Sequence, residues 1–167
     1  MAGTPLRAFV TLLFALLLPG CAAYQLGDPS EPLVRAVRLE PVQDRAAVPQ
    51  IRGLLARDLA TSLVRGGQVT LDDDAGAVLE VVIVRWNTRE RTTRVDDTGR
   101  AFSVDATLGA EVTLTAADGT RWLDQTFVTA ETTLFAEPSL SAAEFQAMPP
   151  LSAELAARIA QLVTNPW

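Results

Sequence analysis

Hydrophobic and polar residues alternate strictly along residues 102–115, which is the clearest pattern in the chain. Phe102 and every second residue up to Leu114 are apolar, whereas most positions between them carry a hydroxyl or a carboxylate. A period of two residues is the period of a β-strand. We therefore predict a strand here with one apolar face and one polar face.

The period changes to that of a helix between Val48 and Val64. The apolar residues recur every four positions, at Ile51, Leu55, Leu59 and Leu63. That spacing places them on one side of an α-helix. The segment begins beside Pro49 and ends before Gly66-Gly67, a usual arrangement at helix ends.

Shorter patterns predict the remaining elements. Strands are expected at residues 33–42, 77–86 and 122–134, and the β-branched run 81–84 is typical of a strand covered on both faces. Residues 141–144 resemble a capping box, which marks the start of a helix. Pro149-Pro150 is expected to interrupt the helical segment, and a second helix is predicted over 151–163.

The order β-α-β-β-β-α predicts an α/β two-layer sandwich. We expect a four-stranded mixed sheet with two helices on one face. The first two strands should be parallel and the later ones antiparallel. The uncovered sheet face would be rich in Ser, Thr, Asp and Glu.

The N-terminal residues indicate secretion. The stretch from Ala8 to Leu18 is apolar apart from Thr11, which is too short for a membrane-spanning helix but suits a signal peptide. It ends in Leu18-Pro19-Gly20-Cys21, which resembles the bacterial lipobox. The resemblance implies cleavage before Cys21, which would then carry acyl chains that hold the protein on a membrane.

The expected division of the chain follows from this motif. Residues 1–20 form a lipoprotein signal peptide, residues 21–32 an acylated start with a short tether, and residues 33–167 one α/β domain. The residue after Cys21 is Ala22 and not Asp, the usual inner-membrane retention signal, which favours the outer membrane.

Composition excludes several kinds of chemistry. The chain has 14 arginines, no lysine, no histidine, one cysteine and a net charge of −6. A Ser-His-Asp triad, a Cys-His pair and a His/Cys metal site are therefore impossible. The negative charge disfavours nucleic acid as a partner. We expect no enzymatic activity, no metal and no cofactor.

The start Cys21-Ala22-Ala23-Tyr24-Gln25-Leu26, the element order and the ending 141–167 together resemble the LptE family of lipopolysaccharide-assembly lipoproteins, in a short form. The resemblance implies an outer-membrane lipoprotein on the periplasmic side, with its domain inside the lumen of the LptD β-barrel. It would support assembly of that barrel and transport of lipopolysaccharide. The alternative is a lipoprotein regulator of another periplasmic machine, such as a peptidoglycan synthase.

Two groups of residues are candidates for contacts in such an assembly. Guanidinium groups bind phosphate in bidentate fashion. The arginine-rich segment is therefore a candidate for binding lipopolysaccharide phosphates, and the alternative is a solvated hairpin. Its arginines are Arg85, Arg89, Arg91 and Arg94. Candidates for membrane or barrel contact are Tyr24, Leu26, Ser103, Thr107, Thr113 and Thr115. The acidic trio Asp72-Asp73-Asp74 is expected to form a solvated turn.

Overall fold

The computed structural model describes residues 34–92, 102–136 and 140–164. All of them belong to one compact unit, Pro32–Trp167. Its elements, in chain order, are β1 (Ala36–Leu39), β2 (Gln43–Asp44), α2 (Pro49–Arg65), β3 (Thr70–Leu71), β4 (Val78–Thr92), β5 (Phe102–Thr115), β6 (Arg121–Ala136) and α3 (Leu140–Thr164). Predicted contacts at Cys21, Tyr24, Leu26 and Arg94 fall outside the described residues.

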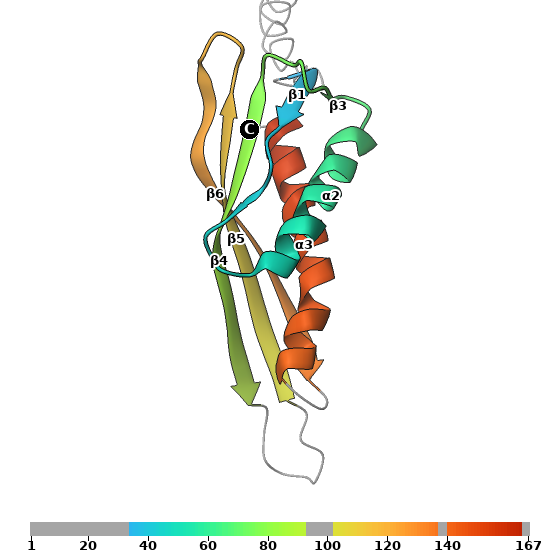
Figure 1. The fold of residues 1–167 in the computed structure, drawn as a ribbon. Coiled ribbons are helices and arrows are strands. Elements are labelled where there is room, and N and C mark those ends of the chain that lie inside the picture. The colour runs from blue at the N-terminus through green and yellow to red at the C-terminus, as the bar shows by residue number, and fades with distance from the viewer. Residues whose placement is uncertain (1–33, 93–101, 137–139, 165–167) are drawn as a thin grey trace, which may run out of the picture. The chain divides into compact units, whose positions relative to one another are not determined.

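The strands form one mixed sheet in the order β3-β1-β4-β5-β6, with β2 pairing β4 beyond the end of β1. β1 runs parallel to β3 and β4, and β2 runs parallel to β4. β4, β5 and β6 are antiparallel neighbours. Figure 1 shows α2 and α3 side by side over one face of this sheet. The predicted two-layer α/β architecture is confirmed.

The strand count differs from the prediction of four, because β2 and β3 add two-residue strands and make six. β2 is separated from β1 by Pro41, which has no N–H to donate to a sheet. The backbone N–H groups of Glu40 and Arg45, on either side of this interruption, donate to Leu79 and Ile83 of β4 at 3.0 and 2.8 Å. The predicted strand 33–42 is therefore shorter, at Ala36–Leu39, and a second short strand follows it at Gln43–Asp44.

Helix α2 matches the predicted helix. Ile51, Leu55, Leu59 and Leu63 are all at most 1% exposed. The helix ends where the N–H of Gly67 donates to the carbonyl of Val64 at 2.9 Å. Gly67 has a φ of +65°, a left-handed conformation that suits glycine at a helix end.

Helix α3 departs from the prediction at its start. The helix begins at Leu140, so Ser141 lies inside it and the proposed capping box is wrong. The carboxylate of Glu144 instead accepts a hydrogen bond of 2.9 Å from the hydroxyl of Thr88 in β4. The side chain of Glu144 thus makes a tertiary contact in place of the helix-capping contact that the local motif predicted.

The predicted interruption at Pro149-Pro150 is also wrong, because α3 continues through both prolines. Each proline leaves the carbonyl four residues earlier without its N–H donor. Those carbonyls belong to Phe145 and Gln146, which are exposed like the prolines themselves. Water can satisfy them, while buried residues on the opposite side, such as Leu151, hold the helix against the core.

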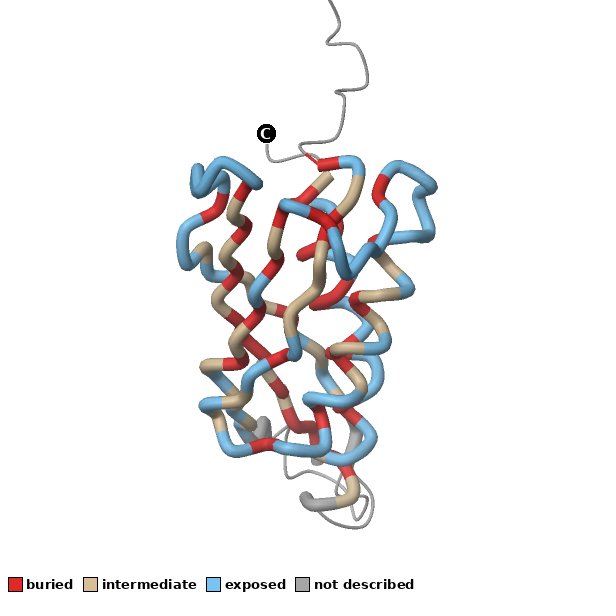
Figure 2. The backbone as a smooth tube through the Cα atoms, turned by 45° about the horizontal axis from the view of Figure 1, so that its top comes forward, coloured by how far each residue is buried: buried red, intermediate tan, exposed pale blue. Residues whose placement is uncertain are grey.

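The core lies between the helices and one face of the sheet. Leu79, Ile83, Leu108 and Leu114 are 0% exposed on the sheet side, and Figure 2 shows buried and less buried positions alternating along the strands. Val82 and Val84 are only half-buried, so the prediction that residues 81–84 are covered on both faces is wrong. Within the described ranges, no helix combines the length and apolarity needed to span a membrane.

Candidate functional site

The sheet face opposite the helices is built by the central parts of β4, β5 and β6. The register places Arg85, Asn87 and Arg89 of β4 opposite Gly109, Thr107 and Asp105 of β5. The β6 partners of these three β5 residues are Thr129, Glu131 and Thr133. We call this surface the open face. Its side chains are half-buried or exposed, and nearly all of them are polar.

A bulge in β4 sets which side chains reach the open face. Ile83 pairs with Ala110 and is buried under the helices. In regular alternation Arg85, two residues later, would point the same way. The register instead shifts between Ile83 and Arg85, and the extra residue turns Arg85 outward. Both Arg85 and Arg89 are exposed on one side of the strand, as the sequence predicted.

Arg85 contacts an aromatic ring on the open face. Its guanidinium carbon lies 4.9 Å from the centre of the Phe127 ring, within the range of a cation–π contact. Phe127 is 45% exposed. A Cβ atom at Gly109 would come within 2.8 Å of Phe127 Cζ and 3.2 Å of Arg85 Cβ. A glycine in β5 is therefore what allows the ring to lie across the strand.

Acidic groups occupy the part of the open face beside Arg89. The carboxylate of Asp105 accepts a hydrogen bond of 2.6 Å from the hydroxyl of Thr133. An open hollow of about 240 Å³ lies here, lined by Asp105, Ala106, Thr107, Glu131, Thr132 and Thr133. In this central part of the sheet, the arginines thus lie on β4 and the carboxylates on β5 and β6. Opposite charges on neighbouring strands stabilise a sheet.

The hydroxyl residues predicted for this face differ in their exposure. Thr107, Thr113 and Thr115 are half-buried on β5. Ser103, by contrast, is only 4% exposed, so its hydroxyl is withdrawn from the surface. Arg91 pairs with Ser103 in the register, and its side chain is outside the described set.

Sequence reasoning missed Phe127, Gly109 and Asp105. The signal that could have found the cluster is Gly109, the one residue in the polar series of β5 without a side chain. A glycine inside a strand often marks the close approach of another group. The β5–β6 register decides which group approaches the glycine, and the pattern of residues along the chain does not reveal that register.

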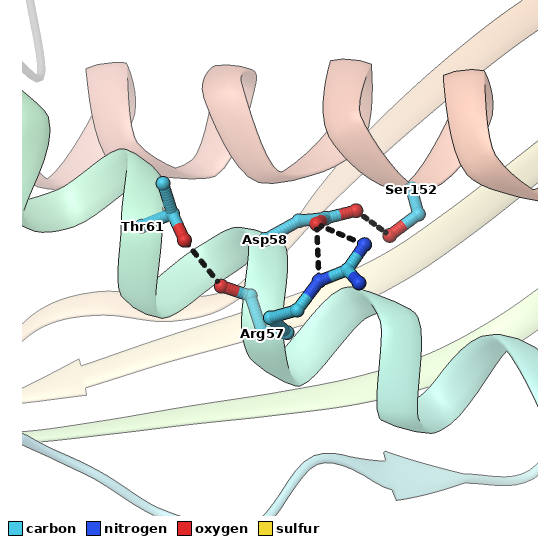
Figure 3. A network of polar contacts seen from close by, with 4 residues as sticks. All are labelled: Arg57, Asp58, Thr61 and Ser152. Carbon is cyan, nitrogen blue, oxygen red and sulfur yellow. Dashed lines mark hydrogen bonds and ion pairs between the residues drawn. The ribbon is translucent and has the colours of Figure 1, made fainter.

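Polar contacts elsewhere are structural. Between the helices, the hydroxyl of Ser152 donates to the carboxylate of Asp58 at 2.6 Å, and the Nη2 of Arg57 donates to the other oxygen at 3.1 Å (Figure 3). The residues Asp72-Asp73-Asp74 are exposed, and the Asp72 carboxylate accepts the N–H of Asp74 at 2.9 Å, which confirms the predicted turn. Among the residues that the structure describes, no cluster of three metal-ligating side chains occurs.

Comparisons with known proteins match this architecture. A family model described as "LptE: Lipopolysaccharide-assembly" matches residues 34–163. The solution structure of an uncharacterized lipoprotein B from Nitrosomonas europaea is 14% identical with a TM-score of 0.51, covering 83% of this chain and 87% of that one. A crystal structure of a protein from Xanthomonas campestris is 11% identical with a TM-score of 0.54, covering 81% and 88%. No curated protein matches in sequence.

Proposed function

Because the chain belongs to the LptE family and has a role in lipopolysaccharide assembly, we propose that it is an outer-membrane lipoprotein that associates with and plugs an LptD-type β-barrel. Acyl chains on Cys21 would hold it on the periplasmic side of the membrane, with its domain in the barrel lumen. Bound there, it would support assembly of the barrel and transport of lipopolysaccharide. The proposed role is binding, without catalysis.

The open face is the observation that carries this proposal. Both helices cover the same side of the sheet, which leaves three long strands with polar side chains facing outward. The interior of a large outer-membrane barrel is also polar. A plug with a polar sheet face can exchange hydrogen bonds with such a wall without burying unpaired groups.

The direct test is affinity purification of the tagged full-length chain from detergent-solubilised outer membranes, with mass spectrometry of the proteins that accompany it. We expect an LptD-type barrel in a one-to-one ratio. A peptidoglycan synthase in its place would establish the rival function, a regulator of cell-wall synthesis. Recovery of the chain without the barrel would refute the plug.

Anchoring at Cys21 is tested separately. Labelled palmitate should enter the full-length chain and be absent from a Cys21→Ser variant. Without acyl chains the variant should be held less firmly in the outer-membrane fraction, where contact with the barrel would be its remaining attachment. Equal labelling of both proteins would exclude Cys21 as the lipidated residue.

Arg85, Arg89, Arg91 and Arg94 are proposed to bind the phosphates of lipopolysaccharide. Arg85 and Arg89 support this, because both are exposed on one face of β4. An Arg89→Ala/Arg91→Ala variant should bind lipopolysaccharide more weakly and retain its circular dichroism spectrum. A matched control is Arg52→Ala/Arg65→Ala, which removes the same charge from exposed positions of α2. If lipopolysaccharide binding were weakened equally in both variants, the loss of net charge alone would explain the effect.

A further inference from the structure

Strand β4 has two halves with different surroundings. The first half is paired on both sides, with β5 on one and with β1 and β2 on the other. The second half, from Arg85 to Thr92, pairs with β5 alone among the described residues. In Figure 1 this half forms the outer strand in the lower part of the sheet. We call it the β4 edge.

The register identifies the backbone groups that point outward from the β4 edge. In the first half, the carbonyls of Ala77, Leu79 and Ile83 accept hydrogen bonds from the β1–β2 side. Outward-pointing residues alternate along an antiparallel strand, and the bulge before Arg85 shifts their positions by one. The outward N–H and C=O groups after the bulge are those of Trp86, Thr88, Glu90 and Thr92.

The opposite edge of the sheet is treated differently. There, α3 packs against β6 (Figure 1), and Nη1 of Arg158 donates to the carbonyl of Thr129 at 2.8 Å. This contact occupies an edge acceptor that another strand would need. Of the four outward residues, Trp86 and Thr88 are fully described, and the backbone groups of these two have no hydrogen-bond partner among the described residues. Among the described residues, one edge of the sheet is thus protected and the other is available.

The side chains at the β4 edge favour one kind of incoming strand. On the open face, Arg85, Asn87 and Arg89 are exposed, while Trp86 and Thr88 are half-buried on the helix side. β5 already places Asp105 opposite Arg89. A second copy pairing antiparallel would bring arginines against arginines, and like charges directly opposite destabilise a sheet. An acidic strand would instead place carboxylates beside these arginines, as β5 does with Asp105 beside Arg89.

We propose that the β4 edge binds an extended segment of a partner protein as an added antiparallel or parallel strand. That segment alternates acidic residues, which lie beside Arg89 on the open face, with apolar residues, which pack beside Trp86. Arg85 joins this contact by turning its guanidinium away from the ring of Phe127. Main-chain hydrogen bonds supply affinity in this mode, and alternate side chains supply specificity. The inference is independent of the barrel plug, because it rests on the open edge and its charge.

The test measures amide hydrogen exchange by NMR on the full chain in detergent micelles. The probe is a synthetic peptide of about eight alternating Glu and Val residues, about the length of a strand. We expect it to slow exchange at Trp86, Thr88, Glu90 and Thr92 by about tenfold. A peptide of alternating Lys and Val should have no such effect.

Two variants identify the cause. Thr88→Pro removes one outward N–H and should abolish protection. Its matched control, Thr88→Val, keeps that N–H but loses the same hydroxyl contact with Glu144, and it should behave as the parent does. Should Thr88→Pro fail to fold, Arg85→Glu/Arg89→Glu serves in its place and should reverse the preference toward the Lys peptide.

Three outcomes would overturn the inference. They are protection by neither peptide, equal protection by both, and protection of the same four amides by lipopolysaccharide micelles but not by the Glu peptide. The last result would assign the edge to lipid. None of these outcomes depends on whether an LptD-type barrel copurifies, so the two proposals fail separately.

Discussion

The two faces of strand β5 have opposite environments one residue apart. Leu108 is 0% exposed on the side that the helices cover, while Thr107 is half-buried on the open face. Burial of the apolar series stabilises the fold. The polar series contributes little to that burial, so it is free to carry charge and hydroxyl groups. Stability and binding are thereby assigned to different faces of the same strand.

The largest effect should come from the covered face. Leu108→Ala should lower the free energy of unfolding by about 2–5 kcal/mol, since it leaves a cavity in a packed core. Thr107→Ala, one residue away, should change it by less than about 0.5 kcal/mol. Urea unfolding followed by circular dichroism measures both. Similar losses in the two variants would mean that the open face is as important to folding as the core.

A smaller loss of stability is expected when the polar contact between helices α2 and α3 is removed. Asp58→Ala should cost about 1–3 kcal/mol, because it leaves the hydroxyl of Ser152 buried without its partner. Adding Ser152→Ala to that variant should cause little further loss. Urea unfolding of the two single variants and the double variant measures the coupling, and strict additivity would contradict a direct contact.

On the open face, Gly109→Ala should cost about 1 kcal/mol, since the new methyl group would displace the ring of Phe127. The loss should disappear when the substitution is made in a Phe127→Ala background. Thermal unfolding of the four proteins provides the comparison. A loss of equal size in both backgrounds would indicate a backbone effect of glycine and not contact with the ring.

The smallest effect is expected at the exposed β5–β6 turn. The N–H of Thr120 donates to the carboxylate of Asp118 at 2.8 Å, and its hydroxyl also contributes, which together hold the pKa of Asp118 below its ordinary value. A lowered native pKa stabilises the fold above the unfolded pKa, and this contribution is lost as pH falls through the native pKa. Asp118→Asn should be slightly less stable at neutral pH.

The difference between Asp118→Asn and the parent should vanish in acid, where both side chains are neutral. Melting temperatures measured from pH 7 down to pH 2 follow this change. A difference that stays constant over the whole range would show that the carboxylate charge plays no part.

Local periodicity predicted most of the fold correctly. The spacing of Leu55 and Leu59 and the alternation around Leu108 each reflect one buried face, which a single element displays by itself. Strand β4 extends to Thr92, six residues past the predicted end at Trp86, because its second half is polar and carries no apolar series. Pairing with β5, which periodicity does not report, holds those residues in a strand.

The site was less predictable than the fold, for the same reason. Counting alternate residues correctly predicted that Arg85 and Arg89 lie on the same side of β4. The prediction holds because the bulge lies before Arg85 and does not disturb the alternation between the two arginines. The Phe127 contact joins β4 to β6 across β5, and the Glu144 contact joins α3 to β4. Both depend on tertiary register, which overrode the local capping motif at Ser141.

The place of β1 in the sheet also has a consequence for the order of folding. The hydroxyl of Thr70 reaches the carbonyl of Arg35 across 35 positions of sequence, and β1 lies between β3 and β4. The β4–β5–β6 meander, in contrast, joins neighbours in the chain. Contacts between distant segments form late because loop closure must precede them. The protein should therefore complete its sheet, with β1 in place, only after the meander has formed.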